Sequence, residues 1–152
     1  VDDHAILLLK TAGLFHDAGH TISYDDHEYY GTQIAREILP KYNYNEEEIN
    51  RISDLIMATQ LPPNPQNQLE KIMCDSDLDY LGRSDFIPVS NTLYKEMRAQ
   101  GKIDSINEWN KIQLKFLSKH QFFTETANKL REVNKQKQIE RIKKLIVDEV
   151  EH

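Results

Sequence analysis

The sequence predicts an all-α, single-domain helical bundle, and three observations support this. Glycine and proline number only five each, which is too few for the many turns of an all-β fold. No window shows sustained alternation of apolar and polar residues, the period of a half-buried strand. Signals that start and stop helices recur along the whole chain instead. We therefore expect helices joined by short loops over residues 1–152.

The first half of the chain is expected to hold four helices. The first begins after Asp2 and Asp3, continues as an apolar run to about His16 and stops at Gly19. The second and third begin at capping-box patterns, in which an N-terminal side chain and a glutamate three residues later bond to each other's backbone. They run from Asp25-x-x-Glu28 to Pro40 and from Asn45-x-x-Glu48 to a stop before Pro62-Pro63. The fourth runs from about Gln68 to Gly82.

The second half is expected to hold three helices bounded by similar signals. They are Phe86 to Gln100 with Gly101 as the stop, Ser105-x-x-Glu108 to about Lys119, and a long helix from about Thr124. The last helix is expected to pack on the body through one apolar stripe. The residues of this stripe are Leu130, Val133, Ile142, Leu145, Ile146 and Val150.

Length and charge exclude several classes of protein. The chain has 152 residues, which suits one domain, and its longest apolar run, residues 5–9, is far too short to span a membrane. The net charge of -6 argues against a uniformly basic nucleic-acid-binding surface. Residues 128–152 carry seven Lys/Arg and five Asp/Glu, whereas the remainder carries twelve and twenty. The acidic charge therefore lies in the body of the chain.

The only cysteine, Cys74, cannot form an internal disulfide, and we expect it to be buried. A chain without disulfides fits a reducing compartment, so a cytoplasmic location is expected. The first residue is Val1 rather than Met, so we expect the natural chain to begin earlier.

A histidine–aspartate pair ends the first expected helix, which is otherwise apolar. His16 and Asp17 follow Leu14 and Phe15, so the pair is expected beside the core. An ionisable pair there has to be hydrogen-bonded or bound to a metal, because burying an unpartnered charge is expensive. Neighbouring helical side chains differ by about 100° in direction, so both could converge on one ion beyond the helix end. A hydrogen-bonded core histidine is the alternative that the residues alone leave open.

Three carboxylates, Asp75, Asp77 and Asp79, crowd one stretch of an expected helix, where aspartate is a poor helix former and like charges repel. Asp77 has apolar residues one turn away on both sides, so it is expected to point inward. Asp75 has Lys71 and Asp79 at the same spacing, so a solvated position is expected. The alternative is that all three decorate the surface.

Two further histidines lie near this pair in the sequence. His20 follows His16 by four residues, in an expected loop. His27 falls in the first turn of the next helix, where the helix dipole disfavours a cation but not a neutral, metal-binding imidazole. Glu28 is explained as the capping partner of Asp25, so we expect it to be structural.

The order of these pieces resembles the HD-domain superfamily of metal-dependent phosphohydrolases, and its bacterial members in particular. The resemblance covers about residues 5–85, and residues 86–152 are similar to the helical tail of such proteins. It is carried by Leu14-Phe15-His16-Asp17-Ala18-Gly19-His20, by His27-Glu28-x-x-Gly31, and by Asp75-Ser76-Asp77-Leu78-Asp79-Tyr80-Leu81-Gly82. It implies one HD-like helical domain over residues 1–152.

The resemblance also implies a divalent metal ion between the helices, with Mn, Fe, Zn, Ni, Co and Mg all open. His16 and Asp17 match the paired metal ligands of the family, and Asp77 matches its closing aspartate. His20 stands where some relatives have a phosphate-contacting lysine. His27 matches an additional metal ligand of two-metal members.

Two positions depart from the pattern of the family. Its first histidine, on a helix before the pair, has no match, and many relatives carry another histidine where Ala58-Thr59-Gln60 stands. We therefore expect one metal rather than two. The usual lengths of helices and connections place the missing histidine about 5–25 residues upstream of Val1.

The activity that the resemblance implies is hydrolysis of a phosphate ester, with nucleotides favoured, by a metal-activated water. His20, His27 or Asp75 would protonate the leaving oxygen. The expected partners are small phosphate esters and not membranes or nucleic-acid duplexes, and homo-oligomerisation is left open. Two alternatives remain: a catalytically degenerate HD module that binds a ligand or partner without turnover, and a di-iron oxygenase.

Overall fold

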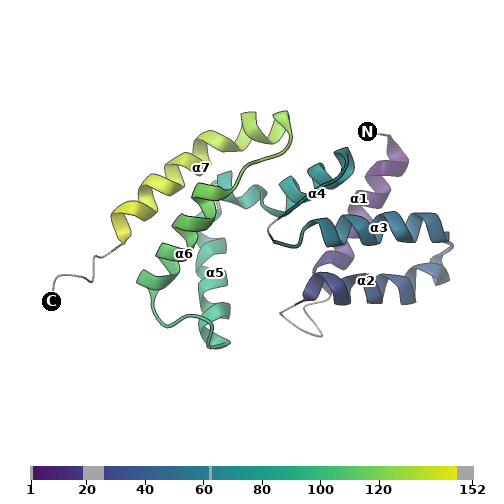
Figure 1. The fold of residues 1–152 in the computed structure, drawn as a ribbon, viewed down its shortest axis with the longest axis horizontal. Helices are drawn as coiled ribbons and strands as arrows, with labels where there is room; N and C mark the ends of the chain where they lie inside the picture. Colours follow the sequence, from purple (N-terminus) through teal and green to yellow (C-terminus); the bar gives the residue numbers. More distant parts are fainter. Residues whose placement is uncertain (1, 19–25, 62, 147–152) are drawn as a thin grey trace. The chain divides into compact units, whose positions relative to one another are not determined.

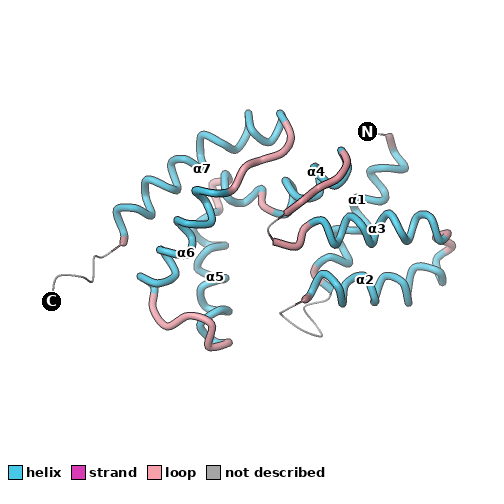
Figure 2. The backbone as a smooth tube through the Cα atoms, viewed as in Figure 1, coloured by secondary structure: helices cyan, strands magenta, loops and turns pink. Residues whose placement is uncertain are grey.

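The computed structural model describes residues 2–18, 26–61 and 63–146 and confirms the all-α class (Figures 1 and 2). These ranges contain seven α-helices and no strand, and none of the helices is long and apolar enough to cross a membrane. The chain divides into two compact units, residues 1–77 and residues 78–152. That both units belong to one HD-like domain of residues 1–152 stays a prediction.

The first unit is built from four helices around one apolar core. They are α1 (Asp3–His16), α2 (His27–Ile38), α3 (Glu46–Ala58) and α4 (Gln68–Asp77). Helix α3 contacts the other three, and α1 also contacts α2 and α4. The core residues are Leu8, Ala12, Ala35, Leu39, Ile49, Ile52, Leu55, Ile56 and Met73. Because α1 touches every other helix of this unit, its end is held by packing on several sides.

Side-chain caps start α1 and α3 where the sequence predicts. Asp2 accepts a hydrogen bond from the backbone N–H of Ala5 at 2.7 Å. At the start of α3 the capping box is complete. The backbone N–H of Glu48 donates to Asn45 Oδ1 at 2.8 Å, and that of Asn45 donates to Glu48 Oε1 at 2.9 Å. Each cap satisfies backbone donors that a helix start otherwise leaves without a partner.

Helix α2 begins and ends differently from its neighbours. The predicted capping residue Asp25 lies outside the described residues. The helix starts after Asp26, whose φ of 57° is left-handed and whose side chain makes no cap hydrogen bond. At the other end, Pro40 falls in a 3-10 turn, η2 (Leu39–Tyr42), which Asn43 closes with a φ of 68°. Asp26 therefore does not cap the first turn of α2, and the helix packs against α1 and α3.

The predicted single helix from Gln68 to Gly82 is wrong. Helix α4 ends at Asp77, and the chain continues as a separate 3-10 turn, η3 (Asp79–Gly82). Leu78 between them has φ -106° and ψ 14°, outside the α-helical range. As a result, Asp77 is the last residue of a helix rather than a residue in the middle of one.

The second unit holds η3, α5 (Phe86–Ala99), α6 (Ile106–Lys119) and α7 (Glu125–Leu145). Helix α7 packs on α6 and on η3, and η3 also contacts α5. The predicted roles of Ser105 and Gly101 are confirmed: Ser105 caps α6, and Gly101 follows α5 with a φ of 71°. Thr124, the expected start of the last helix, caps α7. The core residues are Leu78, Leu81, Phe86, Leu117, Ile139 and Ile142.

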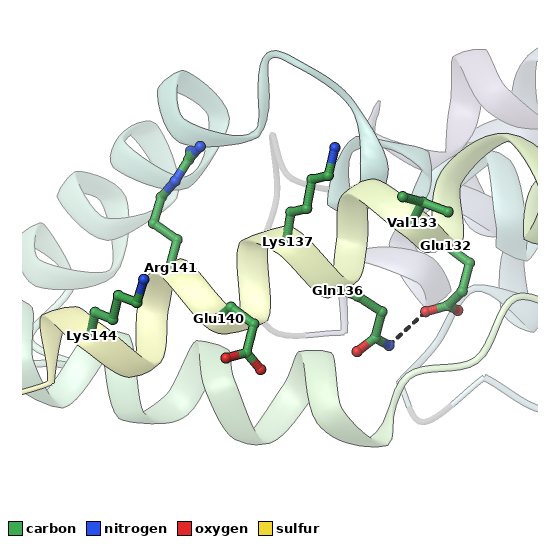
Figure 3. Close-up of a pocket in the computed structure, with 7 residues that line it drawn as sticks. All are labelled: Glu132, Val133, Gln136, Lys137, Glu140, Arg141 and Lys144. Atoms are coloured by element: carbon green, nitrogen blue, oxygen red, sulfur yellow. Dashed lines mark hydrogen bonds between the residues drawn. The ribbon is translucent and has the colours of Figure 1, made fainter.

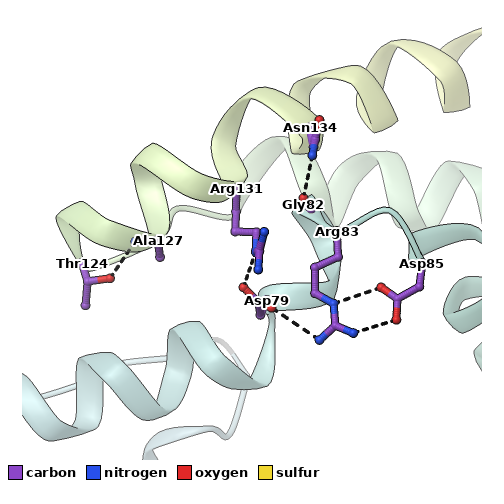
Figure 4. A network of polar contacts seen from close by, with 8 residues as sticks. All are labelled: Asp79, Gly82, Arg83, Asp85, Thr124, Ala127, Arg131 and Asn134. Atoms are coloured by element: carbon purple, nitrogen blue, oxygen red, sulfur yellow. Dashed lines mark hydrogen bonds and ion pairs between the residues drawn. The ribbon is translucent and has the colours of Figure 1, made fainter.

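Polar contacts and one glycine join η3 to α7 (Figure 4). Arg131 Nε donates to Asp79 Oδ1 at 2.6 Å, and Asn134 Nδ2 donates to the carbonyl of Gly82 at 3.2 Å. Residue 82 has to be glycine for this approach, since a Cβ there would collide with the backbone carbonyl of Arg131. Arg83 extends the network, because its Nη1 lies 3.5 Å from Asp79 Oδ2 and its Nη2 lies 2.9 Å from Asp85 Oδ2.

The predicted apolar stripe of the last helix is right only in part: Ile142 is buried, and Ile146 packs against the core of the second unit. Leu130, Val133 and Leu145 are each more than half exposed, and Val150 lies outside the described residues. The buried face consists of Lys135, Gln138, Ile139 and Ile142. At about 100° per residue, Leu130 and Val133 lie about 180° and 120° around the helix from Ile139, so one face cannot hold all three.

The outer face of α7 carries a surface pocket (Figure 3). Its lining residues are Glu132, Val133, Gln136, Lys137, Glu140, Arg141 and Lys144. All seven belong to one helix, so this feature is an open surface rather than an enclosed site. It contains none of the histidines or aspartates that the sequence singles out.

Candidate functional site

The ends of three helices meet in the first unit. His16 is the last residue of α1, Asp77 is the last of α4, and His27 is the first of α2. Helix α2 comes close to the end of α1 because residue 31 is glycine. A Cβ on Gly31 would lie 2.6 Å from the backbone oxygen of Phe15. The packing of the core therefore brings together side chains that are far apart in the sequence.

His16 lies between two carboxylates. His16 is 9 % exposed, and each nitrogen of its ring faces an aspartate. Nε2 lies 3.1 Å from Asp77 Oδ1, and Nδ1 lies 3.1 Å from Asp17 Oδ1. The Asp77 side chain is 23 % exposed, whereas that of Asp17 is 72 % exposed. The structure thus brings two of the predicted ligands, Asp17 and Asp77, into contact with the ring of the third, His16.

The charges around His16 favour a cation at this point. Burial by itself lowers the pKa of His16. The hydrogen bond and charge of Asp77 raise it, as do the charges of Asp17 and Glu28. Together these effects outweigh burial, so the pKa of His16 is raised above 6.5. Helix C-termini carry partial negative charge, and both α1 and α4 end here. A carboxylate at the last residue of α4 is unfavourable unless a positive charge lies nearby. A protonated His16 would supply that charge, and a metal ion would supply it equally.

His27 lies next to this group. Its ring centroid is 5.8 Å from that of His16, and the two rings meet edge to face at 73°. His27 Nε2 lies 3.3 Å from Glu28 Oε1, whose side chain is 9 % exposed. The structure therefore brings together two histidines and three carboxylates from three helix ends.

The expected positions of the other two aspartates need correction. Asp75 is buried, at 5 % exposure, where the sequence predicted a solvated side chain. The prediction compared Asp75 with Asp79 one turn further along a single helix, but the helix ends at Asp77. Asp79 belongs to the second unit and pairs there with Arg131. The catalytic role of Asp75 stays a prediction.

Cys74 is buried without a disulfide partner, as predicted. Its thiol donates to the backbone oxygen of Ala58 at 3.1 Å. Burial, with the charges of Asp77, Asp75 and Glu70 adding to it, raises the pKa of Cys74 to about 12. The side chain therefore stays a neutral thiol and does not offer a thiolate to a metal or a substrate.

The pair His16 and Asp77 fits two neighbouring positions around one metal ion. Ligands at about 2.1 Å that are 90° apart around an ion lie about 3.0 Å from each other, and the two atoms are 3.1 Å apart. Asp17 faces the other ring nitrogen, so it would have to turn to join the same ion. Residues 2–18, 26–61 and 63–146 contain no group of three or more His, Cys, Asp or Glu side chains arranged to hold a metal. That His16, Asp17 and Asp77 bind one ion together stays a prediction.

His20 lies outside the described residues, so its catalytic role also stays a prediction. Glu28, by contrast, is a residue that the sequence analysis treated only as a cap. A signal for its burial was present in the spacing of Glu28, Gly31, Thr32 and Ala35, which places all four on one face of α2. The glycine within this set marks the side on which α2 comes close to another helix.

Comparison with known proteins identifies the family to which the first unit belongs. The family model described as HD domain matches residues 2–79, just over half of the chain. Neither the comparison with curated proteins nor that with solved structures gives a significant match. The matched residues include His16, Asp17, His27 and Asp77, and they nearly coincide with the first compact unit. The chain therefore belongs to the HD domain family.

Proposed function

We propose that the chain hydrolyses a phosphate ester, and a nucleotide in particular, at a divalent metal ion bound by His16 and Asp77. HD-domain proteins are in general metal-dependent hydrolases. The observation that carries the proposal is the 3.1 Å approach of His16 Nε2 and Asp77 Oδ1 at the meeting point of two helix C-termini. A nitrogen and a carboxylate oxygen are donors that divalent transition metals accept.

His16 and Asp77 would hold the ion, and Asp17 would either join them or orient the His16 ring through Nδ1. A bound divalent ion lowers the pKa of a water molecule and neutralises charge on a phosphoryl oxygen. Residues 1–77 carry five Lys/Arg against fourteen Asp/Glu, a net charge of -9. An anionic substrate would be repelled by this unit unless a cation were bound there.

His27 is the described residue best placed to protonate the leaving oxygen. Its ring lies 5.8 Å from that of His16, close enough for both to reach one phosphate group. Asp75 is buried, and its acidic proton would have to leave an enclosed position. We therefore assign the role of general acid to His27 within this proposal.

A catalytically degenerate module is the second candidate. It is favoured because the described residues contain no group of three or more His, Cys, Asp or Glu side chains arranged to hold a metal. The stretch Ala58-Thr59-Gln60 offers no additional histidine. Such a module would bind the nucleotide or a partner without turning it over.

The test is metal-dependent turnover by the full 152-residue chain. Metal-stripped protein would be assayed with a panel of nucleotides and other phosphate esters, with each candidate metal added in turn. The proposal expects phosphate release that appears with metal and disappears with chelator and in His16→Gln. A matched control is His4→Gln, since His4 is exposed and pairs with Glu48 away from the site. Nucleotide binding without phosphate release under every metal would support the degenerate module instead.

A further inference from the structure

Glu28 is a buried carboxylate that the proposed reaction does not yet use. It is the second residue of α2, and its side chain is 9 % exposed. A buried carboxylate needs compensation, because its desolvation is unfavourable. The positive end of the α2 dipole supplies part of it, and the His27 ring, with Nε2 at 3.3 Å from Glu28 Oε1, supplies a direct partner.

The position of Glu28 is fixed by the packing of α2. Gly31, Thr32 and Ala35 share its buried face, and Gly31 holds this face close to the end of α1. Glu28 therefore lies on the face of α2 that is packed against the core. Its side chain is 9 % exposed, and that of His27 is 21 % exposed.

We propose that Glu28 is a positioning residue that accepts a hydrogen bond from the protonated Nε2 of His27 and holds that ring edge-on to His16. With the proton on Nε2, the neutral ring has its lone pair on Nδ1, so the contact fixes both the orientation and the tautomer. The catalytic consequence rests on the proposed function: the imidazolium form of His27 would keep its Nε2 proton on Glu28 and give its Nδ1 proton to the leaving oxygen, which leaves this neutral tautomer. The contact itself does not depend on that function.

Loss of the acceptor would weaken the hold on the His27 ring in two ways. The ring could rotate about its side-chain bonds, and the proton could move between the two nitrogens. Partners that orient a histidine in an active site are commonly worth about 10–100-fold in activity. We therefore expect a loss of turnover of that size without loss of the fold.

Two substitutions separate the acceptor from the packing. Glu28→Met fills the same space with an apolar, unbranched side chain but accepts no hydrogen bond. Glu28→Gln removes the charge but keeps an acceptor oxygen. The matched control is Glu37→Met, which makes the same change at an exposed position of the same helix.

The readout is the tautomer of His27 in the metal-free full-length chain, measured by ¹⁵N NMR of the imidazole at about pH 9, above the usual histidine pKa of about 6.5. We expect Nε2 to be protonated in the wild type, in Glu37→Met and largely in Glu28→Gln, with a mixture of tautomers in Glu28→Met. In the phosphatase assay, kcat should fall about 10–100-fold in Glu28→Met and less in Glu28→Gln.

Unchanged His27 signals in Glu28→Met would overturn the proposal, as would an equal change in Glu37→Met. If the wild type hydrolyses no phosphate ester, the proposed function fails, but the tautomer measurement still decides whether Glu28 positions His27. A Glu28→Met chain that loses its helical circular dichroism would assign Glu28 to folding rather than to positioning, unless Glu28→Gln folds and keeps the wild-type tautomer.

Discussion

His16 Nε2 lies 3.1 Å from Asp77 Oδ1, although two whole helices, α2 and α3, separate the residues in the chain. Each of the two residues ends a helix, so two partial negative charges point at their meeting place. The charges of the neighbouring carboxylates outweigh burial and raise the pKa of the His16 imidazole, which favours a positive charge at this place. This relationship is the basis of the metal site that we propose.

Asp17→Ala is expected to reduce phosphate release by at least about 100-fold, the upper end of what the loss of a metal-supporting carboxylate produces. Its side chain is 72 % exposed, so the free energy of unfolding should change little. Steady-state assays and thermal unfolding would measure the two effects. Asp54→Ala, at an exposed position of α3, serves as the control. Equal turnover in Asp17→Ala and the wild type would show that the chemistry lies elsewhere.

Gly31→Ala is expected to destabilise the chain by about 1–2 kcal/mol, because overpacking outweighs the gain in helix propensity. The added Cβ would lie 2.6 Å from the backbone oxygen of Phe15, so α2 has to move away from α1. Gly13→Ala is the matched control, since a Cβ on Gly13 meets nothing within 4 Å. That change should stabilise α1 by about 0.5–1 kcal/mol. Chemical denaturation of both variants measures the difference, and a stable Gly31→Ala would contradict the close approach.

Gly82→Ala tests the second unit in the same way. The added Cβ would collide with the backbone carbonyl of Arg131, so η3 and α7 could not keep their contact. We expect a loss of about 1–3 kcal/mol in the free energy of unfolding. The Gly13→Ala variant again gives the baseline for an unobstructed glycine. Wild-type stability in Gly82→Ala would mean that η3 and α7 are further apart than the structure places them.

The stability of the metal-free chain should depend on His16 through its raised pKa. Since the pKa is higher in the folded state than 6.5, protonated His16 adds stability that is complete below pH 6.5 and is lost as the pH rises through the folded pKa. Metal binding requires the neutral ring, so metal affinity should rise over the same window. NMR titration of His16 and unfolding at several pH values measure both effects. A pKa of His16 below 6.5 in the folded chain would contradict the expected loss of stability at higher pH.

The helices could be predicted from the sequence because their signals are local. Asp2, Asn45, Ser105 and Thr124 cap helices by contacts within a few residues, and Gly101 takes the predicted positive φ. Local signals failed where the backbone departs from a regular helix. The break at Leu78 has no proline or glycine to mark it, so the comparison of Asp75 with Asp79 used a helix that does not continue.

Burial of polar side chains was the second difficulty. Lys135 is 2 % exposed, and its ammonium is partnered by the backbone oxygen of His120 at 2.8 Å and by Glu132 at 2.9 Å. The His120 partner lies at the end of α6, so the spacing of residues within α7 alone could not predict that Lys135 would be buried. The inward position of Asp77 could be inferred from Met73, one turn before it in α4, whereas Leu81, the other neighbour used, lies in η3 beyond the end of the helix.

The most direct test of the account is the metal affinity of the full-length chain in a double-mutant cycle of His16→Gln and Asp77→Asn. Calorimetric titration with Mn²⁺ or Co²⁺ would measure the wild type, both single variants, the double variant and the control Asp54→Asn. If both side chains bind one ion, each single change should weaken binding by at least about 100-fold, and the double change should weaken it little further. Wild-type affinity in either single variant, or losses that multiply in the double variant, would contradict a metal ion shared by His16 and Asp77.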